Sequence, residues 1–239
     1  MIHGMARTYV ALGDSMSIDD YAGGAGHGAG SLLLRNIDAD FAGFRHRDLT
    51  TLGYSGCVLA RDGAVAADVL NEQLIQMTEP ATLATVTMGG NDLLRVYGDD
   101  AAATAVRARL AQTVEAVLTR LSAAGTRVVL TTIYDPSDGS GTTAGNAVPD
   151  WPAGPDHVAA VNAMLADLAR RHDAGLADVH AAFRGHGAMV GDVGTSESRP
   201  ADRDLWFCGV VEPNAWGADA IRRVWWEALD RRGWLDCGS

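Results

Sequence analysis

The sequence has few cysteines, few basic residues and no long apolar run. Its three cysteines include no CxxC pair, so neither a disulfide framework nor a zinc knuckle is predicted. No segment approaches 18 consecutive apolar residues, and a transmembrane helix is therefore not expected. The residues before the first expected strand lack an apolar signal core, which leads us to expect a cytoplasmic, reduced protein.

Basic residues are outnumbered by acidic ones. Lys and Arg together number 19 and Asp and Glu 30, giving a formal net charge of −11. This balance argues against nucleic acid or an anionic membrane as the main partner, since both favour basic surfaces. No repeat or low-complexity linker divides the chain, so we expect a single domain over residues 1–239. The oligomeric state is not predicted.

Glycine is concentrated in residues 23–30, beside an acidic pair at Asp19 and Asp20. No Gly-Lys-Ser/Thr follows the glycines, so they do not form a phosphate-binding loop. No further ligand cluster accompanies the acidic pair at a suitable spacing. We therefore predict neither a cofactor nor a metal site.

Apolar strands alternate with periodic helices along the chain. The expected strands span 8–12, 48–52, 84–88, 127–133 and 175–180, and the expected helices span 62–77, 99–124, 156–171 and a segment starting at Asn214. This alternation predicts an α/β fold with a five-stranded parallel sheet covered by helices on both faces. In the strand order 2-1-3-4-5, ligands bind where the order reverses, beyond the carboxyl ends of strands one and three.

Polar turns follow three of these strands. Ser15 follows the first, Gly56 the second and Asn91 the third, so we expect all three around one crevice. A serine in such a place is either a helix N-cap or a nucleophile. Ester hydrolysis by a serine also needs donors for the oxyanion, which the backbone N–H groups of Ser15 and Gly56 and the amide of Asn91 would supply.

Three motifs in this order carry a family resemblance. Gly13-Asp14-Ser15, then Gly56, then Gly89-Gly90-Asn91-Asp92 resemble the SGNH (GDSL) hydrolases over most of the chain. The resemblance implies a three-layer flavodoxin-like fold and metal-free ester hydrolysis. It also implies Ser15 as the nucleophile, with Ser15, Gly56 and Asn91 as the oxyanion hole.

The fourth motif of that family, Asp-x-x-His before the last helix, is absent. Gly209 stands at the aspartate position and Glu212 at the histidine position. A free Glu is a weaker base than His by about 2.2 pKa units, roughly 3 kcal/mol, although burial raises the pKa of a carboxyl. A histidine from elsewhere is the other route, and His186, between two glycines, is the best placed of the seven.

The preferred hypothesis is a triad in which Ser15 attacks, His186 is the base and Glu212 orients the imidazolium. The alternatives are Glu212 acting without His186, and a structural role for both residues. The expected activity is a serine esterase acting on a small acyl ester, such as an acetyl ester, including carbohydrate-linked ones. Two loops, 136–155 and 187–204, with Trp151 and Trp206, are candidates for lining a sugar site.

Two other functions compete with the esterase. The missing Asp-x-x-His motif supports a ligand-binding protein of this fold that has lost catalysis. A flavodoxin-like nucleotide or phosphoacceptor module would rely on Asp14 and a phosphate loop or lysine at the other strand ends, and neither accompanies Asp14.

Overall fold

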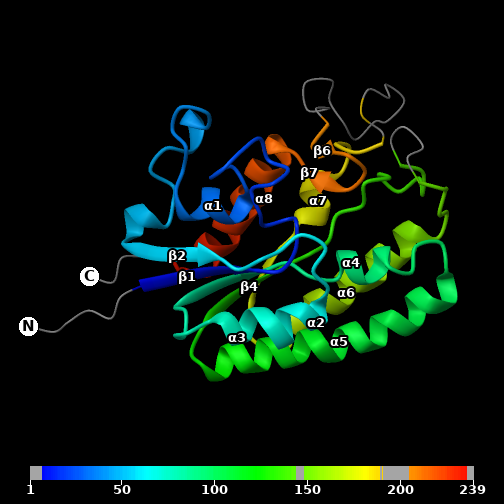
Figure 1. Ribbon diagram of the computed structural model, residues 1–239, viewed down its shortest axis with the longest axis horizontal. Helices are drawn as coiled ribbons and strands as arrows, with labels where there is room; N and C mark the ends of the chain where they lie inside the picture. Colours follow the sequence, from blue (N-terminus) through cyan, green and yellow to red (C-terminus); the bar gives the residue numbers. More distant parts are fainter. Residues whose placement is uncertain (1–6, 144–147, 189, 191–204, 236–239) are drawn as a thin grey trace, which may run out of the picture.

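A parallel sheet of five strands forms the centre of the molecule (Figure 1). The computed structural model describes residues 7–143, 148–188, 190 and 205–235. The strands are β1 (Arg7–Leu12), β2 (Tyr54–Val58), β3 (Leu83–Val86), β4 (Arg127–Thr131) and β5 (Gly175–Ala177). Their order is β2-β1-β3-β4-β5, with parallel pairing throughout. The predicted strand order is confirmed.

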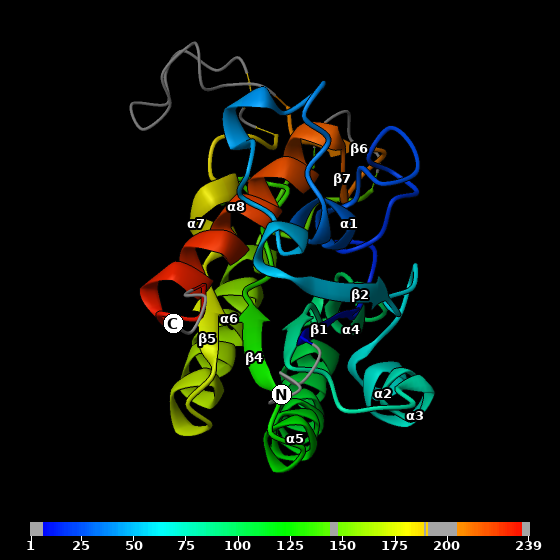
Figure 2. The ribbon, with the colours of Figure 1, turned by 90° about the vertical axis from the view of Figure 1, so that its left-hand side faces the viewer.

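Helices cover both faces of this sheet, which gives three layers (Figure 2). One layer holds α1 (Ala29–Leu34), α7 (Val179–Phe183) and α8 (Ala215–Arg231); the other holds α2 (Ala66–Asp68), the π-helical segment η3 (Val69–Gln73), α3 (Leu74–Gln76), α5 (Asp100–Ala123) and α6 (Gly154–Arg171). Alternate residues of a strand point to opposite faces. Accordingly, Tyr9 and Ala11 of β1 pack in the first layer's core, and Val10 and Leu12 pack in the second. The predicted three-layer α/β fold is confirmed.

The long helices agree closely with the predictions from their apolar spacing. The carboxylate of Asp99 accepts a hydrogen bond from Ala102 N–H at 2.9 Å and caps α5. Asn214 caps α8 by accepting bonds from the N–H groups of Trp216 and Gly217. Among the described residues, no helix is both long and apolar enough to cross a membrane.

The helix expected over 62–77 begins later than predicted. Its regular part starts at Ala66, and its N-cap is Val65 rather than Asp62. The Val65 N–H donates to the Asp68 carboxylate at 2.9 Å. The Ala66 N–H is satisfied from outside the helix, by the carboxylate of Asp92 at 3.0 Å.

The prediction of a strand over 48–52 is wrong. Asp48 accepts hydrogen bonds from the Thr50 hydroxyl and the Thr51 N–H, and these local bonds favour a turn. The chain there forms a short 3-10 helix, η2 (Thr50–Leu52), and a similar one, η1 (Ala42–Phe44), precedes it. The second strand is β2, an edge strand whose three central residues are exposed. It therefore lacks the apolar run on which the prediction relied.

The carboxyl end of the chain adds a hairpin that was not predicted. Strands β6 (Phe207–Cys208) and β7 (Glu212–Pro213) pair antiparallel just before α8. The fifth parallel strand ends at Ala177, earlier than predicted, because Asp178 caps α7 by accepting the Ala181 N–H. His180 consequently lies in α7. Most of the predicted loop 187–204 lies outside the described residues.

Candidate active site

The turn after β1 is held in a shape that requires glycine. Gly13 has a φ of +124°, and a Cβ there would lie 2.0 Å from the Thr87 carbonyl oxygen. The buried Gln73 amide hydrogen-bonds both backbone groups of Gly13. It accepts from the N–H at 2.7 Å and donates to the carbonyl at 2.8 Å. This pair of bonds fixes the turn that presents Ser15.

Asp14 points into the protein. It is almost fully buried, its backbone N–H donates to the Thr87 hydroxyl at 3.0 Å, and its carboxylate accepts the Met16 N–H at 3.1 Å. Burial raises the pKa of Asp14 to about 6, and the nearby charge of Glu212 adds to the effect. The side chain therefore stabilises the turn while Ser15, the next residue, faces the pocket.

Glu212 lies beside Ser15. The β6–β7 hairpin pairs Glu212 with Cys208, and its turn includes Gly209 in the left-handed region at φ +59°. Burial raises the pKa of Glu212, the nearby Ser15 side chain opposes that shift, and the charge of Asp62 reinforces it. The Oε2 atom of Glu212 is buried and has no hydrogen-bond partner among the described residues.

The hairpin is tied to the sheet through Tyr134. The Tyr134 hydroxyl donates to the carbonyl of Val211, the residue before Glu212, at 2.6 Å. Its ring stacks on Phe183 with centroids 4.7 Å apart and meets Phe207 edge-on. Burial, followed by the charges of Asp14 and Glu212, raises the pKa of Tyr134 well above its usual value, so the phenol stays a neutral donor.

His186 is also held close to the hairpin, but by different contacts. Its ring lies flat on Trp206 with centroids 3.4 Å apart and an interplanar angle of 8°. The N–H groups of the flanking Gly185 and Gly187 both donate to the Asp138 carboxylate at 2.9 Å. These contacts fix the loop that carries His186. The catalytic role of His186 stays a prediction.

Asn91 lies on the pocket wall, as predicted, in the first turn of α4 (Gly90–Leu94). Its amide donates one hydrogen bond to the Ala64 carbonyl at 3.0 Å, and the amide has two N–H donors. The residue before α4, Gly89, has a φ of +109°. In this arrangement one donor orients the side chain and the second is available to a ligand beside Ser15.

The prediction that Gly56 follows the second strand is wrong. Gly56 lies inside β2, paired with Tyr9, and a Cβ there would lie 2.4 Å from the Tyr9 carbonyl oxygen. It lines a separate cavity beside α1. Glycine is needed at this position because two backbones approach closely, and the position gives no support to an oxyanion role.

A different glycine, Gly63, lies in the loop after β2. Gly63 has a φ of +67° and is flanked by two residues connected to the site. The charge of Asp62 acts on Glu212, and the carbonyl of Ala64 accepts the Asn91 amide bond. The loop itself contacts the Ser15 turn through Arg61, whose N–H donates to the Gly13 carbonyl at 3.0 Å.

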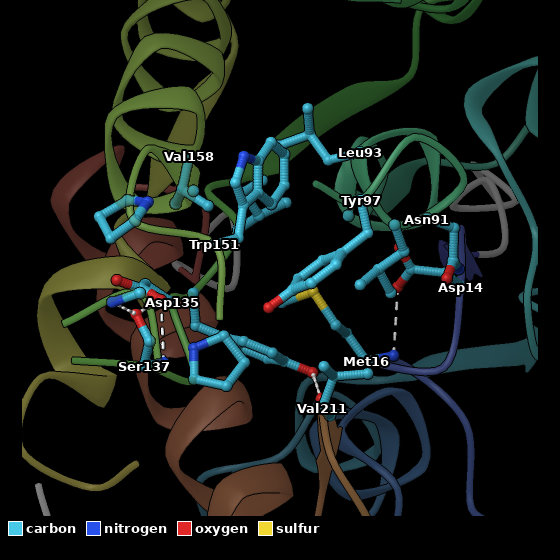
Figure 3. A pocket seen from close by; sticks show the side chains of 18 of the residues that line it. Asp14, Met16, Asn91, Leu93, Tyr97, Asp135, Ser137, Trp151, Val158 and Val211 are labelled. Carbon is cyan, nitrogen blue, oxygen red and sulfur yellow. Dashed lines mark hydrogen bonds between the residues drawn. The ribbon is translucent and has the colours of Figure 1, made fainter. Parts of the chain in front are cut away.

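Beside Ser15 lies a pocket with a mainly apolar wall and a cavity volume of about 100 Å³. It is lined at one end by Asp14, Ser15, Met16 and Asn91 and elsewhere by residues of α4, the segment after β4, and α6. Figure 3 shows Asp14 and Asn91 on one side and Trp151 and Val158 across from them. The volume exceeds the roughly 10–15 Å³ that one water needs, so the pocket accepts a substituent of several atoms.

The polar groups at the far end of the pocket form hydrogen bonds with other groups of the protein. Asp135 accepts hydrogen bonds from the Ser137 N–H, the Ser137 hydroxyl and the Gly139 N–H. The Ser137 hydroxyl also accepts the Gly141 N–H at 3.0 Å. With these groups satisfied, the pocket offers mainly apolar contacts to a ligand. No three His, Cys, Asp or Glu side chains of the described residues group as a metal site.

Comparison with known proteins is consistent with this arrangement. The profile of the GDSL-like lipase/acylhydrolase family matches residues 11–220, and the chain belongs to this family of ester-cleaving hydrolases. No curated protein sequence matches the chain.

Several solved structures share the fold. An extracellular lipase from Streptomyces rimosus superposes with a TM-score of 0.61 at 22% identity, over 95% of this chain and 99% of that one. An acetylxylan esterase from Geobacillus stearothermophilus superposes with a TM-score of 0.62 at 16% identity, over 96% of each chain. An α/β hydrolase from the Lake Arreo metagenome superposes with a TM-score of 0.64 at 18% identity, over 96% of each chain.

Three features of the site were not predicted from the sequence. Gln73 is 60 residues from Gly13 in the sequence, and the apolar spacing of its segment predicts only a helix. The loop that carries Gly63 is the second feature, because the strand expected over 48–52 is in fact β2, Tyr54–Val58. The tyrosine that supports the hairpin, Tyr134, directly follows the fourth predicted strand, and its position at a strand end was the available signal.

Proposed function

We propose that the protein hydrolyses carboxylic esters through an acyl-enzyme on Ser15, with the Glu212 carboxylate as the general base. The observation that carries the proposal is the position of the Glu212 carboxyl beside the Ser15 side chain, close enough for Ser15 to lower the pKa of that carboxyl. A carboxyl whose pKa is raised is a better base than an ordinary one. The proposal differs from the triad predicted from the sequence because the proton passes directly to Glu212, without His186.

The first half-reaction follows from the position of Glu212 beside Ser15. Ser15 Oγ attacks the ester carbonyl while its proton moves to Glu212, and negative charge develops on the carbonyl oxygen. The backbone N–H groups of Ser15 and Gly63 and the free amide N–H of Asn91 would stabilise that oxyanion. The tetrahedral intermediate then collapses, the bond to the alcohol oxygen breaks, and protonated Glu212 gives its proton to the leaving alkoxide.

The second half-reaction reverses these roles. Glu212, again ionised, takes a proton from a water that attacks the acyl-enzyme carbonyl. When this intermediate collapses, Ser15 Oγ leaves and recovers its proton from Glu212. Each turnover consumes one ester and one water and releases one acid and one alcohol. The side chain of Glu212 therefore needs to be ionised at the start of both half-reactions.

The pocket beside Ser15 supports an apolar acyl group. Its wall is mainly apolar, and its polar groups at the far end are satisfied internally. We therefore propose esters of acids longer than acetic acid as the better substrates. The sequence led us to expect small acyl esters, such as acetyl esters, including carbohydrate-linked ones. Comparing kcat/KM for an acetyl ester with kcat/KM for esters of longer acids tests this proposal.

A catalytically inactive binding protein is the second candidate. Two observations favour it: Gly209 replaces the acid that would orient a base, and the Oε2 atom of Glu212 has no hydrogen-bond partner among the described residues. It predicts that apolar carboxylic acids bind the pocket and that esters bind without being hydrolysed.

The intact mass of the protein after reaction with a fluorophosphonate distinguishes the two candidates. The esterase predicts one adduct on the wild type and none on Ser15→Ala. It also predicts that labelling slows strongly in Glu212→Gln and persists in His186→Ala. Strong slowing in His186→Ala would instead support the triad predicted from the sequence. Absence of an adduct on the folded wild type, together with acid binding seen by calorimetry, would support the binding protein.

A further inference from the structure

The pocket has a reactive end and a closed end. Ser15 and Asn91 line the first, and Trp151 and Val158 line the part across from it (Figure 3). An acyl chain attached to Ser15 Oγ would extend from the first towards the second. The side chain of Trp151 is buried, with 6% of its surface exposed, so it forms a wall of the pocket instead of an open rim.

Several contacts hold the Trp151 ring in place. Its Nε1–H donates to the Asp100 carboxylate at 2.7 Å, which satisfies the only polar atom of the ring. The ring stacks on His157 with centroids 5.2 Å apart, and Tyr97 meets it edge-on at 5.0 Å. A Cβ on Gly154 would lie 3.2 Å from the ring, so even the backbone of α6 packs closely against it.

The backbone of Trp151 is fixed as well. Its N–H donates to the Gly141 carbonyl at 2.8 Å, and its carbonyl accepts the Gly154 N–H at 2.8 Å. A ring held by its backbone, its polar atom and two aromatic neighbours has few ways to move aside for a longer ligand. It therefore acts as a fixed boundary for a chain that grows from Ser15.

We propose that Trp151 sets the maximum length of the acyl chain that the enzyme accepts, and that Asp100 is the residue that positions it. This inference rests on the proposed esterase function and adds the chain-length specificity of the same site. Each methylene that fits before the ring should raise kcat/KM by up to about fourfold, equivalent to the ~0.8 kcal/mol of a buried CH₂. A chain that reaches the ring should lose this gain.

The test is the chain-length profile of kcat/KM with p-nitrophenyl esters from acetate to decanoate. In Trp151→Ala we expect the optimum to move to acyl chains at least two carbons longer than in the wild type. Trp151→Phe, a smaller change that keeps an aromatic ring, should move the optimum in the same direction by less. It also provides a reading if the alanine variant does not fold.

Two further variants separate this role from general loosening of the fold. Asp100→Ala should broaden the profile towards longer chains, and Asp100→Asn, which retains an acceptor for the indole N–H, should restore the wild-type profile. Trp226→Ala is the matched control, because Trp226 packs on Phe44 with the helices of the opposite layer. Its profile should keep the wild-type optimum.

The outcomes separate this inference from the proposed function. If Ser15 is labelled by a fluorophosphonate and esters are hydrolysed, but Trp151→Ala and Trp151→Phe keep the wild-type optimum, Trp151 does not set the length. A similar shift in Trp226→Ala would also overturn the inference, because the effect would not be specific to the pocket. Absence of both labelling and hydrolysis in the wild type would overturn the esterase proposal and this inference together.

Discussion

The Ser15 side chain lies beside the carboxyl of Glu212, 197 positions later in the chain. Glu212 stands where the resemblance to SGNH hydrolases leads one to expect a histidine. A carboxylate in this place needs no acid to fix its tautomer. The aspartate that orients a histidine is therefore not needed. Gly209 stands at its position and forms part of a tight hairpin turn.

Removing the charge of Glu212 should stop most of the reaction. In Glu212→Gln the amide still fits beside Ser15, but it has no site for the serine proton. We expect kcat with p-nitrophenyl butyrate to fall by about 10²–10⁴-fold, the usual contribution of a general base. Thermal unfolding of the variant, followed by circular dichroism, is the control for its fold. A kcat within about threefold of the wild type would exclude Glu212 as the base.

The acidic limb of the pH profile should report the ionisation of Glu212. The base must be ionised, and its pKa is raised by burial and then by the charge of Asp62. Activity should therefore be lost on acidification at a higher pH than an ordinary Glu would give. In Asp62→Asn one of the causes is removed, so the limb of kcat/KM against pH should move to lower pH. A limb that stays in place or moves upward would contradict this assignment.

The amide of Asn91 should contribute mainly to the transition state. In Asn91→Ala we expect kcat to fall by about 10²–10³-fold with a small change in KM, as for the loss of one oxyanion donor. The variant also leaves the Ala64 carbonyl without its partner, so its unfolding free energy should be measured in parallel. A rise in KM at constant kcat would mean that Asn91 only binds the ground state.

Buried Asp14 should make the stability of the protein depend on pH. Its pKa is about 6 in the folded protein against 3.8 for the free side chain, so the folded state binds this proton more tightly. The stability from that proton is complete below about pH 4 and is lost as the pH rises through 6. The difference corresponds to on the order of 3 kcal/mol.

The variant Asp14→Asn cannot ionise but keeps an oxygen for the Met16 N–H. Urea unfolding of wild type and variant from pH 4 to pH 8 measures the effect. We expect the variant to gain stability relative to the wild type as the pH rises, with most of the gain between pH 4 and 6. A difference that does not vary with pH would contradict the assignment of this pKa to Asp14.

Gln73 should be important for the turn that precedes Ser15. In Gln73→Leu the buried N–H of Gly13 loses its partner, which costs about 1–3 kcal/mol, while the Gly13 carbonyl keeps the hydrogen bond from the Arg61 N–H. Gln76→Leu, at an exposed position a few residues later in α3, is the matched control and should change stability by less than about 0.5 kcal/mol. Urea denaturation measures both. Equal stability of the two variants would refute a role for Gln73 in holding the turn.

Elements with strong apolar periodicity could be predicted from the sequence. This applies to β1, β3 and β4, which are buried on both faces, and to the long helices α5, α6 and α8. Strand β2 was misplaced because it is an exposed edge strand whose centre is Ser-Gly-Cys. The β6–β7 hairpin has two-residue strands, too short for an alternating pattern to be recognised.

The site was predictable where a residue follows a buried strand. Ser15 and Asn91 were predicted in this way, and Glu212 was predicted from its place relative to the last helix; their catalytic roles stay predictions. Gly63 and Gln73 could not be identified because their roles depend on the tertiary fold. The loop of Gly63 is located only once β2 is correctly placed, and Gln73 meets Gly13 only when η3 packs against the end of β1.

The measurement that tests the account most directly is the second-order rate constant for fluorophosphonate labelling of Ser15, determined against pH. It should be made on wild type, Glu212→Gln and His186→Ala. Labelling needs only the attack of the serine on the probe, so its rate reports activation of the serine and does not depend on hydrolysis of an acyl-enzyme. We predict that the wild type and His186→Ala share one rise with pH, and that Glu212→Gln is slow at every pH. Rapid labelling of Glu212→Gln with the wild-type pH dependence, and loss of that dependence in His186→Ala, would contradict the account.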